Sequence, residues 1–241
     1  MRYLRIIMLL GLFLPIEALQ AHQLKKHTTK IHVGSRVVKL VQYSYGKGKF
    51  FIHVHESETT AKRAALAYIK RHGGKLLTLS HNKERNVSFC LDEKYYAFDP
   101  NRIFTPSGIE KTLRAQGNYS IKAEVQVQKL AKAILKRIPQ HGKVIAVHNN
   151  KEYSMVDYFH KLSKDVRAVH QDKCASMRNF YLVTQEKSFC HLKNKAFNVV
   201  WQAQHPEDDG SLSVRLRKRN YVNVEAAYDA YVTQLKMLKY S

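Results

Sequence analysis

Two histidines and one glutamate, set far apart along the chain, have the types and spacing of a catalytic metal site. His53 and Glu56 lie three residues apart at the end of an apolar run, and His148 closes a second apolar run. Two imidazoles and a carboxylate are ligands that zinc accepts, and this set leaves one coordination position open for water. These residues therefore predict a catalytic zinc site rather than a structural one.

The segment around the first histidine allows a second register, because His55 and Glu58 have the same spacing as His53 and Glu56. In a chain with 13 histidines such pairs also arise by chance. The residue types alone do not choose between the two registers.

The run from Asp99 to Phe104 adds a group that can bind an anionic substrate. Asn101 and Arg102 stand side by side in this run. A guanidinium forms two parallel hydrogen bonds with a carboxylate, which fixes both its position and its orientation. Asp99 could orient this segment, or it could form a structural ion pair with Arg102.

Taken in order, these motifs resemble the superfamily that contains the zinc metallocarboxypeptidases, aspartoacylase and succinylglutamate desuccinylase. The run from Asp99 to Phe104 matches the Asp-x-Asn-Arg-x-Phe signature of that superfamily, and the similarity extends over roughly residues 49–230. The short stretch before His148 is closer to the deacylase branch. The resemblance implies the metal ligands His53, Glu56 and His148, the substrate-binding residues Asn101 and Arg102, and the catalytic residues Glu225 and Arg85.

The resemblance also favours the first register, because the family places a polar residue directly before the glutamate ligand and His55 fits that position. It gives Glu225 the role of a carboxylate that takes a proton from the metal-bound water and passes it to the leaving nitrogen. Glu225 is also typical of an exposed glutamate at a helix start. Arg85 is assigned by position alone, as an oxyanion donor. The glycines that surround the first histidine in the deacylases are absent here, which bears on the substrate more than on the metal.

The ends and the length of the chain predict one exported domain. Arg2 and Arg5 precede a short apolar stretch and small residues at 18–21, as in a cleavable signal peptide. We expect a signal peptide at residues 1–21 and a single zinc-hydrolase-like domain at 22–241, with a periplasmic or secreted location. An uncleaved anchor is the alternative, although the apolar stretch is short for a membrane span. No transmembrane segment is expected in the mature chain.

The formal net charge of +22 favours anionic partners, such as a cell-wall polymer. The basic residues are scattered and accompany no helix-turn-helix, zinc-finger or RNA-binding signature, so specific nucleic-acid binding is not expected. Export permits a disulfide, but the three cysteines leave one thiol unpaired. The polar turn at residues 208–211 could form a rim of the pocket, or it could be a plain surface turn.

Strand-like and helix-like segments alternate along the chain. Apolar runs near 50–54, 144–147 and 196–201 predict buried strands, whereas helical spacing appears at 57–71, 125–138 and 226–238. This alternation predicts an α/β fold with a mixed central sheet and helices on both faces, as in the zinc carboxypeptidases.

The sequence therefore predicts an exported zinc hydrolase that cleaves an amide bond next to a free carboxylate, with cell-wall peptides among the candidate substrates. One alternative is a deacylase acting on small N-acyl amino acids. Another is a protein that keeps the fold and binds ligands without catalysis.

Overall fold

The computed structural model describes residues 23–161 and 164–241. The expected signal peptide at residues 1–21 lies outside the described residues. Within the described ranges, no helix combines the length and the apolar character that a bilayer crossing requires.

The strands are β1 (Lys25–Val33), β2 (Arg36–Tyr45), β3 (Lys49–His53), β4 (Gly74–Ser80), β5 (Val87–Leu91), β6 (Lys94–Phe98), β7 (Val144–Asn150), β8 (Val166–His170), β9 (Phe180–Val183), β10 (Asn198–Gln202) and β11 (Tyr221–Ala227). The helices are α1 (Thr59–His72), α2 (Pro106–Ala115), α3 (Ile121–Leu135), α4 (Glu186–Lys193), α5 (Leu212–Arg215) and α6 (Tyr231–Tyr240), with a 3-10 helix η1 (Met155–Lys161).

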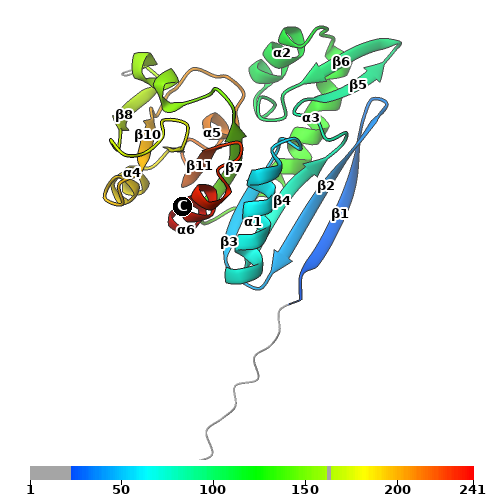
Figure 1. The fold of residues 1–241 in the computed structure, drawn as a ribbon. Helices are drawn as coiled ribbons and strands as arrows, with labels where there is room; N and C mark the ends of the chain where they lie inside the picture. The colour runs from blue at the N-terminus through cyan, green and yellow to red at the C-terminus, as the bar shows by residue number, and fades with distance from the viewer. Residues whose placement is uncertain (1–22, 162–163) are drawn as a thin grey trace, which may run out of the picture.

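One large mixed sheet organises the fold. In the described part of the chain its nine strands follow the order β1-β2-β4-β3-β7-β11-β9-β10-β8. The four central strands β4, β3, β7 and β11 are parallel to one another. On one side β4 pairs antiparallel with β2, which forms an antiparallel hairpin with β1. At the other edge β8 pairs antiparallel with β10. Figure 1 shows the long β1–β2 hairpin at one edge of the sheet and β8 and β10 at the other.

Helices cover both faces of this sheet. Helices α1, α4 and α6 bury apolar residues against one face, together with Phe51 of β3 and Ile145 of β7. On the other face, α3 packs through Val127, Leu130 and Ile134, whose spacing of three and four residues places them on one side of the helix. The expected α/β fold with a mixed central sheet and helices on both faces is confirmed.

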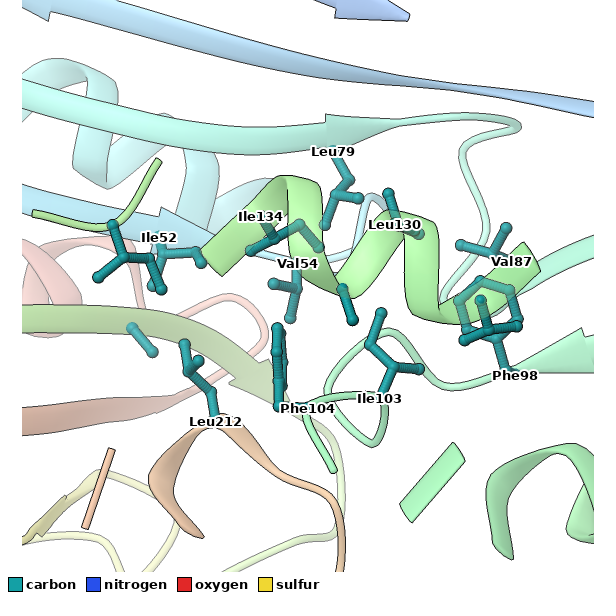
Figure 2. Packing of buried hydrophobic residues seen from close by; sticks show 14 of the residues in the cluster. Ile52, Val54, Leu79, Val87, Phe98, Ile103, Phe104, Leu130, Ile134 and Leu212 are labelled. Atoms are coloured by element: carbon teal, nitrogen blue, oxygen red, sulfur yellow. The ribbon is translucent and has the colours of Figure 1, made fainter. Parts of the chain in front are cut away.

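The part of the core that contacts α3 extends to the loop that follows β3. Leu130 and Ile134 of α3 pack near Leu79, Val54 and Phe104 (Figure 2). Val54 is 2% exposed and follows directly after β3, so the segment that leaves this strand is held by core packing. The loop that carries the first histidines is therefore anchored, and its polar side chains have defined positions.

Several element boundaries differ from the expected ones. The strand ending near His148 continues to Asn150, because each residue of β7 is buried and paired with β11. The strand before the last helix likewise continues to Ala227, and α6 begins only at Tyr231. Glu225 therefore lies inside a central strand and not at a helix start.

Candidate active site

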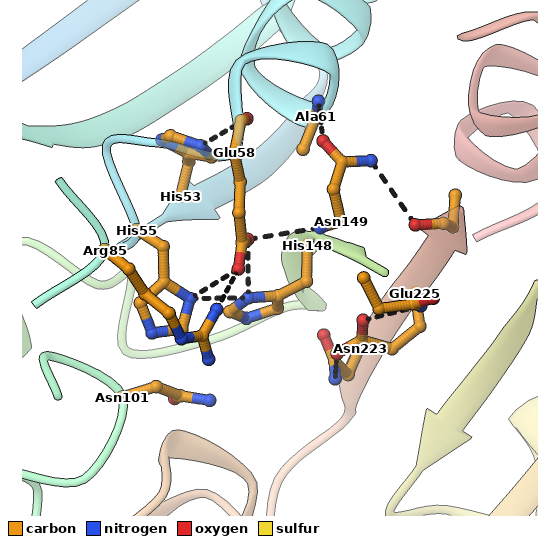
Figure 3. Close-up of polar contacts among 12 residues, drawn as sticks. His53, His55, Glu58, Ala61, Arg85, Asn101, His148, Asn149, Asn223 and Glu225 are labelled. Carbon is orange, nitrogen blue, oxygen red and sulfur yellow. Dashed lines mark hydrogen bonds and ion pairs between the residues drawn. The ribbon is translucent and has the colours of Figure 1, made fainter. Parts of the chain in front are cut away.

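Three buried side chains meet where the central strands β3 and β7 end. Nδ1 of His55 lies 3.2 Å from Nδ1 of His148 and 2.9 Å from Oε1 of Glu58. The second oxygen of Glu58 lies 3.0 Å from Nδ1 of His148. The three residues are between 1% and 3% exposed. Figure 3 shows Glu58 extending from the start of α1 toward both imidazoles.

The resemblance favoured His53 and Glu56 as the pair beside His148. In the structure, the pair beside His148 is His55 and Glu58. His53 is the last residue of β3, and both of its ring nitrogens have protein partners: Nδ1 lies 2.9 Å from Oγ1 of Thr78, and Nε2 donates to the carbonyl of Glu58 across 2.9 Å. Burial lowers the pKa of His53 to about 4, so this ring is neutral. His53 therefore supports the backbone of the site and contributes no atom to the cluster.

Glu56 also points away from the cluster. Its carboxylate accepts hydrogen bonds from the hydroxyl of Ser80 at 2.7 Å and from the backbone N–H groups of His81, Asn82 and Lys83. These donors lower the pKa of Glu56 although burial acts in the opposite direction. Glu56 therefore fixes the loop after β4, and the histidine–glutamate pair that lies beside His148 is His55 and Glu58.

The donor set of His55, Glu58 and His148 fits a tetrahedral metal. Metal–ligand distances of about 2.0–2.1 Å correspond to ligand–ligand edges of about 3.3 Å in a tetrahedron. The Nδ1–Nδ1 separation of 3.2 Å is close to that edge, and each ring nitrogen lies 2.9 or 3.0 Å from a different oxygen of Glu58. With one donor atom from each residue, the three atoms lie within 4.8 Å of one another. Among the described residues, this is the group of histidine and carboxylate atoms that lies within metal-binding distance.

Asp99 supports the cluster from the opposite side of the His55 ring. Its Oδ1 lies 2.7 Å from Nε2 of His55. Burial alone would lower the pKa of His55, but the carboxylates of Glu58 and Asp99 raise it to about 9. The same contacts hold the pKa of Asp99 below its usual range, against the effect of burial. The expected alternative, an ion pair between Asp99 and Arg102, is not formed; Asp99 pairs with His55 and Arg85 instead.

Arg85 reaches the cluster from the loop that Glu56 fixes. Its Nη1 lies 2.5 Å from Oε1 of Glu58, and its Nη2 lies 3.4 Å from Oδ2 of Asp99. The side chain is 53% exposed, so one face of the guanidinium is open to the cavity. This placement is compatible with the oxyanion role that the sequence suggested, which depends on donors beside the reacting carbonyl.

Glu225 faces the cluster from β11, as Figure 3 shows. It is 6% exposed, and its two oxygens accept hydrogen bonds from Asn223 at 3.1 Å and from Asn150 at 3.3 Å. Burial raises the pKa of Glu225, although the neighbouring His148 and the two amides act in the opposite direction. The interpretation as an exposed glutamate at a helix start is wrong, because the residue is buried in a strand. A raised pKa suits a carboxylate that must take up and release a proton near neutral pH.

Asn101 and Arg102 line the same cavity as the cluster, together with Glu225. The amide of Asn101 is already engaged, since its Oδ1 accepts a hydrogen bond from the backbone N–H of Leu212 at 3.3 Å. Arg102 forms an ion pair through Nη1 with Asp209. The predicted rim at residues 208–211 is confirmed by Asp209 and Ser211, which line the cavity.

The cavity measures about 850 Å³ and has both polar and aromatic walls. Tyr153 and Tyr158 share a hydrogen bond between their hydroxyls and stack edge-on against Phe180. Burial raises the pKa of both phenols, so they remain protonated hydrogen-bonding groups at neutral pH. Sequence reasoning missed these two tyrosines, because 14 tyrosines in the chain give no local signal that separates a wall residue from core packing.

Comparison with known proteins gives a distant structural likeness. The chain is similar to an aspartoacylase family protein from Mesorhizobium loti, whose crystal structure aligns with a TM-score of 0.46 and 14% sequence identity over 90% of this chain and 67% of that chain. No protein family model matches the sequence. No curated protein matches it either. A likeness this distant establishes no activity, so the function proposed below depends on the geometry of the chain itself.

Proposed function

We propose that this protein is a zinc-dependent hydrolase that cleaves an amide bond next to a free carboxylate. The observation that carries the proposal is the buried cluster of His55, Glu58 and His148 at the wall of a cavity that also holds Glu225 and Arg102. Two imidazoles and a carboxylate leave one position for water or substrate, which is the arrangement of a catalytic zinc site.

Zinc bound by these three residues would acidify a water molecule and polarise the substrate carbonyl. Glu225, buried and with a raised pKa, would accept the proton of that water and deliver it to the leaving nitrogen. Arg85 is placed beside Glu58 to stabilise the negative charge that develops on the carbonyl oxygen. Arg102 would hold the carboxylate of the substrate through its remaining N–H donors.

A peptide suits the cavity better than a small N-acyl amino acid. Its volume of about 850 Å³ lies in the upper part of the usual range for ligand pockets, roughly 300–1,000 Å³. A carboxypeptidase acting on short peptides would use this space on both sides of the scissile bond. Deacylation of a small N-acyl amino acid is the second candidate, and it uses the same residues. Export, a periplasmic or secreted location and binding to an anionic cell-wall polymer remain predictions from the sequence.

The test is turnover by zinc-loaded protein. The panel should contain dipeptides and N-acyl amino acids, each with a free and an amidated carboxylate. We expect cleavage of the free-carboxylate members only. Glu225→Gln should retain zinc and lose turnover, because it removes a proton shuttle and no ligand. Substrate binding without turnover in the parent protein would favour the non-catalytic alternative.

A further inference from the structure

The guanidinium of Arg102 is paired with a carboxylate that the fold holds in place. Oδ2 of Asp209 contacts Nη1 of Arg102, and Oδ1 of Asp209 accepts a hydrogen bond from the backbone N–H of Ser211 at 2.9 Å. The two side chains are 42% and 47% exposed, so both also face solvent in the cavity. A ligand that carried only a carboxylate would meet a cation whose charge is already balanced.

The loop that carries Asp209 is seated tightly on the Asn101–Arg102 segment. The backbone N–H of Phe104 donates to the carbonyl of Gly210 across 2.9 Å, and the hydroxyl of Thr105 donates to Asp208 across 2.8 Å. Gly210 adopts a φ of +76°, and a Cβ on it would lie 2.3 Å from the carbonyl oxygen of Arg102. Only glycine allows this approach, so Asp209 is a built part of the wall and not a chance surface contact.

A second wall residue has an acceptor with no partner. Oδ1 of Asn223 is buried and forms no hydrogen bond with any described residue, whereas its Nδ2 donates to Glu225. Asn223 is 8% exposed and lines the cavity on β11, between Tyr221 and Glu225. An unpaired buried acceptor costs free energy that a donor on a ligand would recover.

Asn223 and Asp209 line the same cavity. Tyr221 lies two residues before Asn223, so both side chains project from the same face of β11. The pKa of Tyr221 is raised by burial first and then by Glu225, Tyr158 and Asp209. The β11 wall therefore connects the proton shuttle Glu225 with the Arg102–Asp209 pair.

The charge of the cavity wall differs from that of the chain. Among the described residues, five acidic side chains line the cavity (Glu58, Asp165, Glu207, Asp209 and Glu225), against three lysines and arginines (Arg85, Lys151 and Arg102). In the whole chain 41 basic residues outnumber 19 acidic ones. Acidic residues are therefore concentrated at this cavity relative to the rest of the chain.

We propose that the amino acid released by this enzyme carries a cationic nitrogen in its side chain, in addition to its α-carboxylate and α-amino group, and that Asp209 and Asn223 determine this specificity. The substrate class is then a peptide or N-acyl compound that ends in a diamino acid. The carboxylate binds the N–H donors of Arg102 that Asp209 leaves unused, and the ammonium donates to Asp209 and to Oδ1 of Asn223. This inference rests on the proposed function for the direction of cleavage.

A neutral side chain would fit these groups less well. It would leave the Oδ1 acceptor of Asn223 without a hydrogen bond. The negative charge of Asp209 would then be balanced only by the Arg102 guanidinium, which must also hold the substrate carboxylate. An ammonium carries three N–H donors and can serve both acceptors. Charge-assisted hydrogen bonds are the stronger ones, so the preference should be at least about tenfold in affinity.

The test compares lysine with norleucine, which has the same carbon chain without the side-chain ammonium group. Calorimetry on zinc-loaded protein measures binding of the two free amino acids. Turnover of benzoylglycyl-lysine and benzoylglycyl-norleucine is measured in parallel. We expect lysine to bind about tenfold more tightly or better, and the lysine peptide to be preferred in kcat/KM by a similar factor.

Two variants identify the residues responsible. Asp209→Asn keeps the acceptor for Ser211 and removes the charge, and Asn223→Leu removes the unpaired acceptor. Each should reduce the ratio of lysine affinity to norleucine affinity by several-fold. Asp92→Asn is the matched control, because Asp92 pairs with Lys122 away from the cavity and its variant should keep the full preference.

The outcomes separate this inference from the proposed function. Equal affinity for the two amino acids, or no measurable binding of either, overturns the inference even if both peptides are cleaved. Tighter binding of lysine without cleavage of either peptide supports the inference about the cavity and contradicts the proposed hydrolase. A lysine preference that survives in both variants also overturns the assignment, since other residues would then carry it.

Discussion

Nε2 of His55 lies 2.7 Å from Oδ1 of Asp99, a residue 44 positions further along the chain. A carboxylate can only accept a hydrogen bond, so His55 must donate from Nε2. Its Nδ1 is then directed at Glu58 and His148, where a metal would need a lone pair. A carboxylate behind a ligating histidine fixes the orientation of the ring and raises its basicity. In this protein Asp99 performs both tasks.

Zinc binding should release a proton from His55 near neutral pH. The pKa of His55 is about 9 in the metal-free protein, so the ring is protonated at pH 7 and must lose that proton to bind zinc. Calorimetric titration with zinc at pH 7, in buffers of different ionisation enthalpy, measures the number of protons released. We expect about one from His55, and apparent affinity should rise as the pH increases toward 9. A binding enthalpy that is the same in all buffers would contradict this prediction.

The stability of the metal-free protein should fall as the pH rises from about 6.5 to about 9. A group whose pKa is raised on folding stabilises the protein fully below its unfolded pKa, and that contribution is lost as the pH passes its folded pKa. For His55 the loss amounts to about 3 kcal/mol or less in the free energy of unfolding. Urea unfolding across this pH range measures it. Asp99→Asn should flatten the profile, because it removes one of the carboxylates that raise the pKa.

The two glutamates of the ambiguous segment should differ in their effect on zinc. Glu58→Gln removes a charged ligand from the cluster and should weaken zinc binding by at least about tenfold to a hundredfold, the scale of losing a partner at a metal site. Glu56→Gln should keep zinc, since its carboxylate binds the loop at 80–83 and lies outside the cluster. Turnover by the Glu56→Gln variant should fall, because the loop at 80–83 helps to position Arg85 beside Glu58. Zinc content after dialysis and a competition titration distinguish the variants, and the opposite order would restore the register His53–Glu56.

The comparison of sequence and structure shows what local patterns can and cannot predict. The apolar runs before His53 and His148 predicted two central strands, because strands buried on both faces need continuous apolar residues. The register of the histidine–glutamate pair could not be predicted in the same way. His53–Glu56 and His55–Glu58 have identical spacing, and the choice depends on how the chain turns after β3. The packing of Val54 and the donors that surround Glu56 decide it, and both come from residues distant in sequence.

Some residues of the site lie beyond any local pattern. Asn223 and Asp209 reach the cavity only because β11 pairs with β7 and the loop at 208–212 packs on Arg102. The order of motifs predicts Glu225, and the structure extends its strand through Ala227. A Glu followed by Ala residues is typical of a helix start, and tertiary pairing of β11 overrides that local preference.

Gln234 should be a positioning residue for His148. It is fully buried on α6, donates from Nε2 to the carbonyl of His148 at 3.0 Å, and accepts from Asn149 at 2.8 Å. Gln234→Leu would leave these groups unpaired and should cost about 1–3 kcal/mol in the free energy of unfolding. Zinc affinity should fall as well, because the backbone N–H of Asn149 also donates to Glu58. Val232→Ala, at a residue of α6 that is 78% exposed, is the control and should change neither quantity.

Substitution of Arg102 distinguishes an enzyme that requires a free carboxylate on its substrate from a general amidase. Its planar fork matches a carboxylate with two parallel hydrogen bonds, and a lysine ammonium does not reproduce that geometry. Arg102→Lys should therefore reduce kcat/KM for substrates with a free carboxylate by about tenfold to a hundredfold, the scale of a lost charge-assisted hydrogen bond. Steady-state kinetics on matched free and amidated substrates measures the effect.

Amidation of the substrate carboxylate deletes the same contact from the other side. It should reduce turnover by the parent enzyme by a similar factor, and it should reduce turnover by Arg102→Lys hardly further, since two changes that remove one contact do not add. Arg215→Lys is the control, because Arg215 ends α5 and does not line the cavity. That variant should show the full effect of amidation. If the parent enzyme cleaves free and amidated substrates equally well, Arg102 serves only to hold Asp209 and its loop, and the carboxylate-directed function is wrong.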